Sequence, residues 1–204
     1  MKKYWARQFG KPTGFGGRIA TFIMNRANGA NYKAVVETVP KSGEILDIGF
    51  GNGYLIKKLS ANSDATIYGV DISADMVKNA TKRNKKAVKE GKVVLTLGLV
   101  DNIPFDAQFD FIYTVNTVYF WQDLKAGLSH IKEKLKDGGT FINVLFTKEF
   151  LAKHSYTQYG FTKYEPQELL AVTAEAGFST EIIEIEKAKS FFVKATKRES
   201  QFKG

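Results

Sequence analysis

The chain has 204 residues, of which 44% are hydrophobic and 25% charged, a composition ordinary for one globular domain with a full core. It contains no cysteine, which excludes disulfides, thiolate metal sites and cysteine nucleophiles. The formal net charge of +9 allows two interpretations, a polyanionic partner or a lysine-rich solvated surface. The lysines are densest over residues 78–92 and at the C-terminus, but they occur along the whole chain, which favours the second interpretation.

The N-terminal segment has basic residues but no apolar stretch behind them, because glycine, proline and polar residues interrupt any candidate. We therefore expect no signal peptide, no membrane span and a cytoplasmic protein. Residues 1–28 are rich in aromatic residues and glycine and end in an expected helix over residues 18–25. We interpret them as an N-terminal cap or lid, followed by the main domain over residues 29–204.

The middle of the chain alternates short apolar stretches with stretches of helical spacing. After an expected helix over residues 31–38, five buried strands are expected, at residues 45–48, 66–70, 93–97, 109–115 and 140–146. They are almost continuously apolar and rich in β-branched and aromatic residues, as strands covered on both faces should be. Helices between successive strands imply a doubly wound parallel sheet with right-handed crossovers.

Start and stop signals place two of these helices. Ser73 can cap a helix that runs through Lys82, with Asp75 in its first turn. Leucine and isoleucine recur at helical spacing over residues 124–135 and stop before an expected turn at residues 136–139. The fifth strand should follow that turn.

The C-terminal part of the chain predicts a helix and then a hairpin. Pro166 stands just inside a helix that Gly177 ends. Residues 181–186 alternate polar and apolar side chains, residues 187–189 can turn, and residues 191–193 resume a strand. Such a hairpin would place an antiparallel strand in the otherwise parallel sheet.

A glycine-rich segment follows the first expected strand. Asp47 precedes Gly49, Gly51 and Gly53, and Asp71 ends the second strand. Glycines let the backbone approach a ligand closely, and a carboxylate at the end of a strand can accept two hydrogen bonds from a ribose diol. A dinucleotide fingerprint would instead read G-x-G-x-x-G and hold a pyrophosphate. The Asp47 carboxylate would repel a pyrophosphate, and it suits a ligand with an ammonium and a sulfonium.

This pattern resembles the D-x-G-x-G-x-G loop and ribose-binding acid of the class I S-adenosylmethionine (SAM)-dependent methyltransferases, over about residues 30–197. The resemblance implies SAM as cofactor and S-adenosylhomocysteine as product. In that family the loop holds the methionine part of SAM, and Ile72 and Met76 correspond to positions expected on the adenine face. The cofactor-binding residues that the resemblance implies are Asp47, Gly49, Phe50, Gly51, Asn52, Gly53, Asp71, Ile72, Met76, Leu99, Val100 and Asn116.

Residues 98–105 resemble the family's third motif, commonly G-D-A-x-x-L-P-F, with one departure. The family's acid contacts the adenine amino group, and Leu99 stands in its place here. Either the backbone around Val100 and apolar packing hold the adenine, or Asp101 substitutes for the missing acid.

The chain lacks the signatures of several methyltransferase branches. Methylation of pyrimidine C5 normally needs a cysteine nucleophile. Enzymes that methylate base amines usually have an N-P-P-Y-like tetrapeptide after strand four, where this chain has Asn116-Thr117-Val118-Tyr119. Residues 116–121, together with residues 11–18 and 24–26, resemble a bacterial subgroup of small-molecule-type methyltransferases.

No strong candidate for a general base emerges. The SAM sulfonium is already activated, so the protein mainly supplies alignment and exclusion of water. If the acceptor needs deprotonation, the candidates are His154, Tyr119, Tyr156 and Tyr159, near an acceptor pocket expected under the N-terminal segment and the loop at residues 148–163. No histidine or carboxylate spacing indicates a metal site.

The sequence thus predicts an enzyme, a SAM-dependent methyltransferase with a small-molecule acceptor. The family implies a seven-stranded sheet in the order 3-2-1-4-5-7-6, with strand seven antiparallel, helices on both faces and a helical N-terminal cap. Two alternatives stay open. An RNA methyltransferase would use the basic surface to bind nucleic acid, and a non-catalytic SAM-binding module would keep the glycines without an acceptor pocket.

Overall fold

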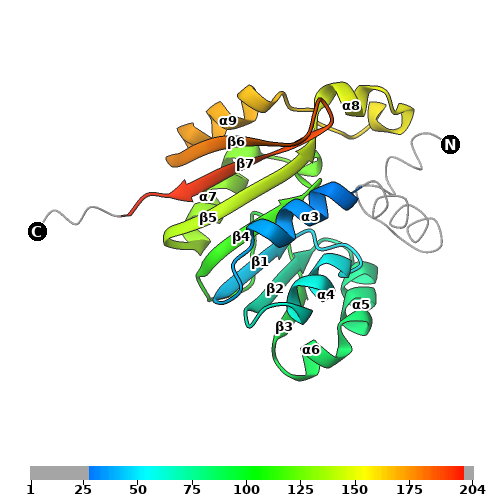
Figure 1. Cartoon of the computed structure of the whole chain (residues 1–204), viewed down its shortest axis with the longest axis vertical. Coiled ribbons are helices and arrows are strands. Elements are labelled where there is room, and N and C mark those ends of the chain that lie inside the picture. The colour runs from blue at the N-terminus through cyan, green and yellow to red at the C-terminus, as the bar shows by residue number, and fades with distance from the viewer. Residues whose placement is uncertain (1–27, 200–204) are drawn as a thin grey trace, which may run out of the picture.

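A computed structural model describes residues 28–199, the side chain of Tyr156 excepted. Its centre is a seven-stranded sheet in the order β3-β2-β1-β4-β5-β7-β6, with helices on both faces (Figure 1). The strands are β1 (Glu44–Ile48), β2 (Thr66–Asp71), β3 (Val93–Leu97), β4 (Phe109–Val115), β5 (Leu135–Phe146), β6 (Phe178–Glu186) and β7 (Ser190–Lys197). The predicted strand order is confirmed.

The first five strands are parallel, and β7 is antiparallel to both of its neighbours, β5 and β6. β1 lies between β2 and β4, so the chain leaves β1 toward one edge of the sheet and later returns to its other side. In open α/β sheets, ligands bind outside the carboxyl ends of the strands at such a switch point. The glycine-rich segment after β1 lies there.

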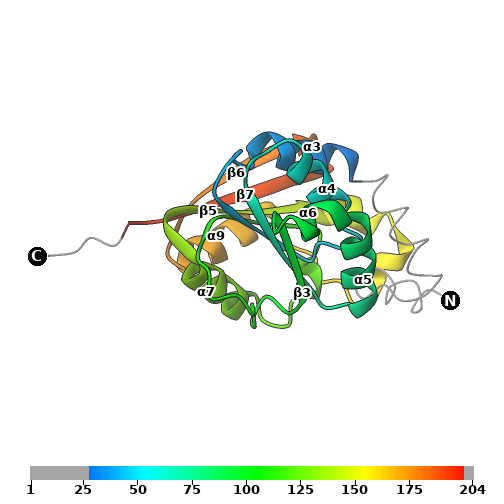
Figure 2. The ribbon, with the colours of Figure 1, turned by 90° about the horizontal axis from the view of Figure 1, so that it is seen from below.

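The helices divide between the two faces of the sheet (Figure 2). The core on one face is built with α3 (Gly29–Thr38), α4 (Tyr54–Ala61), α5 (Ala74–Arg83) and α6 (Lys85–Lys89). The core on the other face is built with α7 (Leu124–Lys134) and α9 (Pro166–Glu175). Three short elements complete the described chain: the 3-10 helix η1 (Val118–Phe120), α8 (Lys148–Ala152) and the 3-10 helix η2 (Ser155–Gln158).

The predicted helix signals act as expected. The Ser73 hydroxyl accepts a hydrogen bond from the backbone N–H of Met76 at the start of α5. Pro166 is the first residue of α9, and Gly177, two residues past its end, has φ +90°. Glycine adopts this left-handed conformation at little cost, which ends the helix there.

β5 begins earlier than the sequence predicts. Leu135 already pairs with Phe109 of β4, and the next pair joins Thr140 to Phe111, so the expected turn at residues 136–139 is an irregularity inside the strand. Leu135 is fully buried, and its burial holds the chain against β4 before the irregularity. The expected loop at residues 148–163 also contains α8 and η2.

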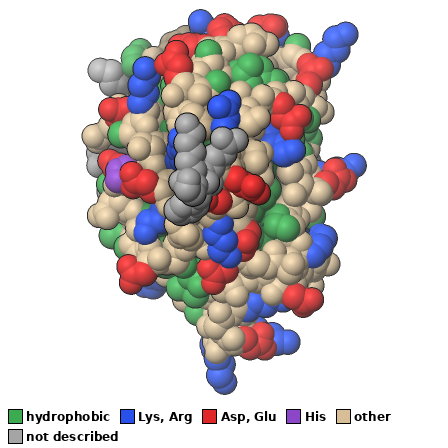
Figure 3. Space-filling view, turned by 90° about the vertical axis from the view of Figure 1, so that its left-hand side faces the viewer, with side chains coloured by type: hydrophobic (Ala, Val, Ile, Leu, Met, Phe, Trp, Pro, Cys, Tyr) green, Lys and Arg blue, Asp and Glu red, His purple; other side chains and the backbone are tan. Residues whose placement is uncertain are grey.

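The predictions for residues 1–27 lie outside the described residues. Within the described part of the chain, no helix has the length and apolar character needed to cross a membrane. On the left-hand side of Figure 1, where the parallel strands begin, lysine, arginine and acidic side chains are intermixed (Figure 3). Lys136, for example, lies 2.8 Å from the Asp110 carboxylate.

Candidate active site

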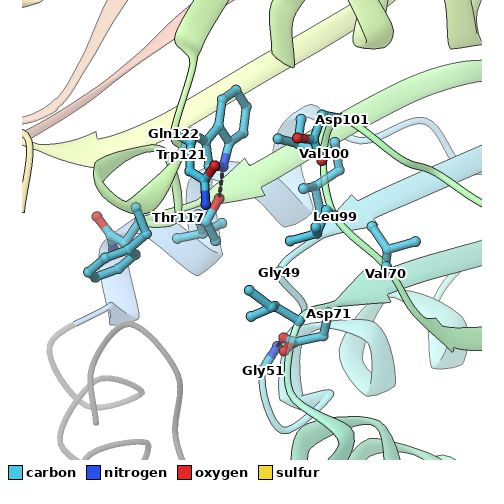
Figure 4. Close-up of a pocket in the computed structure, with 16 residues that line it drawn as sticks. Gly49, Gly51, Val70, Asp71, Leu99, Val100, Asp101, Thr117, Trp121 and Gln122 are labelled. Carbon is cyan, nitrogen blue, oxygen red and sulfur yellow. Dashed lines mark hydrogen bonds between the residues drawn. The ribbon is translucent and has the colours of Figure 1, made fainter. Parts of the chain in front are cut away.

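A cavity of about 210 Å³ opens at the carboxyl ends of the parallel strands. Gly49, Gly51 and Asp71 lie across from Thr117, Trp121 and Gln122 (Figure 4). The cavity therefore has two walls, one made by the ends of β1, β2 and β3 and one by the chain after β4. Its lining residues are Ile48, Gly49, Gly51, Val70, Asp71, Ile72, Gly98, Leu99, Val100, Asp101, Val115, Asn116, Thr117, Phe120, Trp121 and Gln122.

Two of the three motif glycines line the cavity. Gly49 has φ +77°, and a Cβ there would lie 2.3 Å from Cγ2 of Thr117, so no side chain fits. Gly51 has φ +55°, and a Cβ there would meet nothing within 4 Å. The backbone at Gly51 is thus open to the cavity, where a ligand can approach it closely.

The other predicted residues of this loop point elsewhere. Gly53 has φ +71° and caps α4, and a Cβ there would lie 2.7 Å from the Ala80 Cβ, so this glycine permits α4 to pack on α5. Phe50 is buried in the core against Gly69. The side chain of Asn52 accepts hydrogen bonds from Tyr54 N and from the Arg83 guanidinium. These residues do not line the cavity.

Asp71 is a buried carboxylate on the cavity wall. Its Oδ2 accepts a hydrogen bond from Gly51 N at 2.8 Å, and its Oδ1 accepts one from Ser73 N at 2.9 Å. Burial raises its pKa to about 6, although these two hydrogen bonds oppose the shift. Each carboxylate oxygen has a second acceptor site, so the group can still bind two hydroxyls of a ligand.

Asp47 lies beneath the glycine loop and does not line the cavity. It is 3% exposed, and the Tyr113 hydroxyl donates a hydrogen bond to its Oδ2 at 2.7 Å. Burial raises its pKa to about 8, helped by the charge of Asp71 and opposed by the Tyr113 hydrogen bond. A buried carboxylate of this kind gains stability from a nearby cation.

Three apolar side chains line the cavity beside Asp71. Ile72 and Leu99 line the cavity and are 45% and 46% exposed, while Val100 is buried at its edge. Asp101 also lines the cavity, as the substitute for the missing acid would need to. Met76 is buried in the core under α5 and does not line the cavity.

Asn116 forms the corner between the two walls. Its φ of +58° is uncommon for a residue other than glycine, and the side chain is held from both sides. Oδ1 accepts hydrogen bonds from the Tyr119 hydroxyl at 2.8 Å and from Phe146 N at 3.2 Å. Nδ2 donates to Oδ1 of Asn28 at 2.8 Å. This network fixes the chain direction after β4.

The second wall brings the aromatic residues Phe120 and Trp121, which the sequence suggested for an apolar acceptor pocket, together with Thr117 and Gln122, which the sequence analysis did not single out as ligand contacts. Trp121 Nε1 donates a hydrogen bond to Thr117 Oγ1 at 3.2 Å, and its ring packs so closely that a Cβ at Gly127 would lie 2.9 Å from it. Phe120 and Gln122 complete this wall. The position of Thr117 and Gln122 directly after β4, at the ligand-binding edge of the sheet, is the signal that could have found them.

The described candidates for a general base lie away from the cavity. Tyr119 is 2% exposed, and its hydroxyl bonds to Asn116 and to Phe146 N. The His154 Nδ1 lies 2.9 Å from the Phe150 carbonyl oxygen, and Tyr159 is 41% exposed. None of these three residues lines the cavity. The side chain of the fourth candidate, Tyr156, is not among those that the structure describes.

Comparisons with known proteins agree with this geometry. Residues 46–143 match the model of a family described as a methyltransferase domain. The chain is 32% identical over 125 residues to the uncharacterized methyltransferase YdaC of Bacillus subtilis, an alignment that covers 59% of this chain and 67% of that protein. The chain belongs to the class I SAM-dependent methyltransferases.

More distant relatives share this methyltransferase fold. A ubiquinone/menaquinone C-methyltransferase of Geotalea daltonii is 31% identical over 123 residues, 58% of this chain and 52% of that protein. A chain from the complex between the Haloferax volcanii Trm112 methyltransferase activator and a methyltransferase superposes with a TM-score of 0.78, covering 97% of both chains. Its 19% identity shows the fold alone. In length, the chain matches about half of the Geotalea daltonii methyltransferase.

Proposed function

We propose that this methyltransferase transfers the methyl group of SAM to a small, uncharged and largely apolar acceptor. The observation that carries the proposal is the composition of the second cavity wall, where Val115, Phe120 and Trp121 stand beside three neutral polar side chains. Apolar walls with a few polar groups are typical of small-molecule sites. Among the described lining residues the charged ones are Asp71 and Asp101, so an anionic acceptor would find no cation there.

The first wall fits the cofactor. Asp71 is the proposed partner of the ribose hydroxyls, and the open backbone of Gly51 lets the ligand approach. Ile72 and Leu99 offer apolar contact to the adenine, with Asp101 close enough in sequence to reach its amino group. Asp47, buried beneath the loop, would stabilise the ammonium of the methionine part. Met76, Phe50, Asn52 and Gly53 do not line the cavity, and we infer that they shape the loop and the core around the ligand.

SAM supplies an electrophilic methyl group on its sulfonium. The protein's own contribution is to position the acceptor against that methyl group. Gln122 can hydrogen-bond a polar atom of the acceptor, whereas the Thr117 hydroxyl is already bonded to Thr114 and to Trp121 Nε1. The Phe120 and Trp121 rings can exclude water and fix the acceptor's orientation. Because Tyr119 and His154 are engaged elsewhere, we infer that alignment rather than general-base catalysis dominates.

The names of relatives also favour small molecules. The matched proteins include methyltransferases named for quinones, sterols and a rifamycin. The RNA alternative gains nothing from the described lining of the cavity, which includes no lysine or arginine, and the chain has no N-P-P-Y-like tetrapeptide after β4. The non-catalytic alternative is a SAM-binding module without an acceptor pocket. The second cavity wall argues against it, because it offers an acceptor a place beside the cofactor.

An acceptor screen tests the proposal. The purified protein, methyl-labelled SAM and a fractionated small-molecule extract would be incubated together, with total RNA in parallel, and labelled products identified by mass spectrometry. We expect label in neutral apolar compounds, and Trp121→Ala should reduce it while SAM affinity stays within about threefold. Label in RNA, or no transfer to any fraction despite SAM binding, would contradict the proposal.

A further inference from the structure

Residues 1–27 carry six of the chain's nine net positive charges, and within the described residues the positive charge is concentrated on one part of the surface. Residues 54–92, which hold α4, α5 and α6, contain nine lysine or arginine residues and four acidic ones, a net charge of +5. Residues 93–199 contain 12 basic and 14 acidic residues, a net charge of −2. The basic character of the described chain therefore belongs to the β3 end of the sheet, where these helices lie (Figure 1).

Five exposed lysines stand on two consecutive helices, α5 and α6. α5 buries Met76 and Ala80 against the sheet. Lys78 and Lys82 stand two residues further on, about 200° around a helix with 3.6 residues per turn, and so face solvent. We call the exposed set the α5–α6 basic face; its residues are Lys78, Lys82, Lys85, Lys86 and Lys89.

These lysines lack the ion pairs that neutralise cations elsewhere. Among the five, Lys86 has a described ion pair, with Glu90 at 3.9 Å, and both side chains are largely exposed. Outside residues 54–92, eight of the 14 described lysine and arginine residues pair with an acid. The side of the molecule where the parallel strands begin shows basic and acidic side chains intermixed (Figure 3). Unpaired cations close together on a surface attract external anions.

We propose that the α5–α6 basic face docks this methyltransferase on an anionic membrane surface. Residues four apart on a helix lie about 6 Å apart along its axis, so the face presents separate point charges. Such charges attract anionic headgroups without any directional requirement. Leu97 of the neighbouring edge strand β3 points to the same face of the sheet as Val93 and Leu95, which pack in the core beneath α5 and α6. It is 54% exposed and does not line the cavity described above, so it adds apolar contact at the same end of the sheet.

The composition of this face disfavours other polyanions. Single-stranded nucleic acid is bound with aromatic rings for base stacking, and none of the five residues of this face is aromatic. Tyr54, at the start of α4, is partly buried with Lys58 and Arg83 over its ring. Arg83 is the one arginine between residues 54 and 92, and its guanidinium already bonds to Asn52. Protein interfaces are depleted in lysine and enriched in arginine and aromatic residues, the reverse of what this face offers.

The location of the face relates docking to the cavity. α5 begins three residues after Asp71 and two after Ile72, which line the cavity. The α5–α6 basic face runs from the second turn of α5, near the cavity edge of the sheet, to α6, which precedes the start of β3 at the other edge. A membrane along this face would reach the cavity mouth at the α5 end, where an apolar acceptor dissolved in the bilayer could enter. The entry of an apolar acceptor rests on the proposed function, whereas the docking does not. Vesicle binding is measured without methyl transfer, so failure of the docking and failure of the proposed function can be distinguished.

Vesicle binding tests the docking. The full-length protein would be sedimented with vesicles of phosphatidylcholine alone and of phosphatidylcholine with phosphatidylglycerol. The test variant is Lys78→Gln/Lys82→Gln/Lys89→Gln. The matched control is Lys41→Gln/Lys187→Gln/Arg198→Gln, which removes the same charge from exposed residues elsewhere that have no described ion pair. Thermal melting and binding of S-adenosylhomocysteine confirm that both variants fold.

We expect the wild type to bind the anionic vesicles and not the neutral ones. At roughly fivefold in affinity per lysine near the surface, the test variant should lose on the order of 100-fold and the control variant much less. Equal losses in the two variants would show a general charge effect and overturn the proposal. So would absence of binding to anionic vesicles, or RNA binding at physiological salt that the test variant abolishes.

Discussion

The backbone N–H of Gly51 donates a hydrogen bond to the Asp71 carboxylate across 2.8 Å. This contact ties the glycine loop after β1 to the end of β2, which are 20 residues apart in sequence. The other carboxylate oxygen accepts a hydrogen bond from Ser73 N, which precedes α5. Asp71 therefore shapes the backbone around the cavity as well as facing a ligand in it.

Replacing Asp71 should weaken cofactor binding. Loss of a charge-assisted hydrogen-bonding group costs about 1.5–3 kcal/mol, so we expect Asp71→Ala to reduce the affinity for SAM about 10- to 150-fold in calorimetry. Asp64→Asn, an exposed acid before β2, is the control and should bind like the wild type. Unchanged affinity in Asp71→Ala would remove ribose recognition from this residue.

Because Asp71 also holds the loop, a ligand-side control separates the two roles. An S-adenosylhomocysteine analogue that lacks a ribose hydroxyl should bind more weakly than the parent compound to the wild type. The Asp71→Ala variant should bind the analogue almost as tightly as it binds the parent compound, because the partner of that hydroxyl is already gone. Equal losses in both proteins would mean that Asp71 acts only through the loop.

The ligand-free protein should lose stability as the pH rises. Asp47 and Asp71 have pKa values of about 8 and about 6 in the folded state, against 3.8 ordinarily. A carboxyl whose folded pKa is raised contributes stability that is fully present below about pH 4 and is lost as the pH rises through the folded value. Urea unfolding should therefore show a free energy that falls between about pH 5 and pH 8, by up to about 1.4 kcal/mol per pH unit for each proton.

Asp47→Asn provides the check on this pH dependence. The amide cannot ionise, so the fall in unfolding free energy should be flatter throughout, and it should almost vanish between about pH 6.5 and pH 7.5, where Asp71 is already mostly ionised in both states. A wild type whose stability does not change with pH over this range, or a variant with the wild-type slope, would show that Asp47 is ionised in the folded protein already.

Cofactor binding should release a proton. Near neutral pH the buried Asp47 is largely protonated, because its pKa is about 8. A cationic ammonium beside it lowers that pKa, so the carboxyl ionises when SAM binds. Calorimetry in buffers of different ionisation enthalpy measures the release directly. We expect part of one proton at about pH 7 in the wild type and none in Asp47→Asn; the same release in both would place the ammonium away from Asp47.

Much of the fold could be predicted from the sequence because its parallel strands are buried on both faces. β3 and β4 have the predicted bounds, since continuous apolar stretches with clear turns leave little choice of period. The start of β5 could not be predicted, because Asp137, Gly138 and Gly139 have the composition of a turn. Only the tertiary pairing of Leu135 with Phe109 continues the strand through them.

The candidate site was predictable in part. Glycine spacing located the loop, but spacing does not distinguish Gly51, which opens to the cavity, from Gly53, which permits helix packing. Met76 lies on the buried side of α5, and that orientation depends on where the helix begins. The second wall around Trp121 required the three-dimensional path after β4, which the left-handed turn at Asn116 sets.

Leu99 should contribute to cofactor affinity by packing on the adenine. Two leucines allow a matched comparison, because Leu99 lines the cavity with 46% exposure, whereas Leu97 is 54% exposed and does not line it. Leu99→Ala should lower the affinity for S-adenosylhomocysteine about fivefold, as expected for about 1 kcal/mol of lost apolar contact. Leu97→Ala should leave it unchanged, and Leu99→Asp should be tolerated. Similar affinities for Leu99→Ala and the wild type would place the adenine elsewhere.

Gly51 should be required for the cofactor rather than for folding. Gly51 and Gly138 have φ of +55° and +74°, and in both a Cβ would meet nothing within 4 Å, but Gly138 lies in β5 away from the cavity. An alanine at either position costs about 1–2 kcal/mol of unfolding free energy, because a side chain disfavours the left-handed backbone. Gly51→Ala also places a methyl group in the cavity, so its affinity for SAM should fall more than about tenfold in calorimetry, whereas Gly138→Ala should keep wild-type affinity. If the two variants lose the same stability and both bind SAM normally, the ligand does not approach the loop at Gly51.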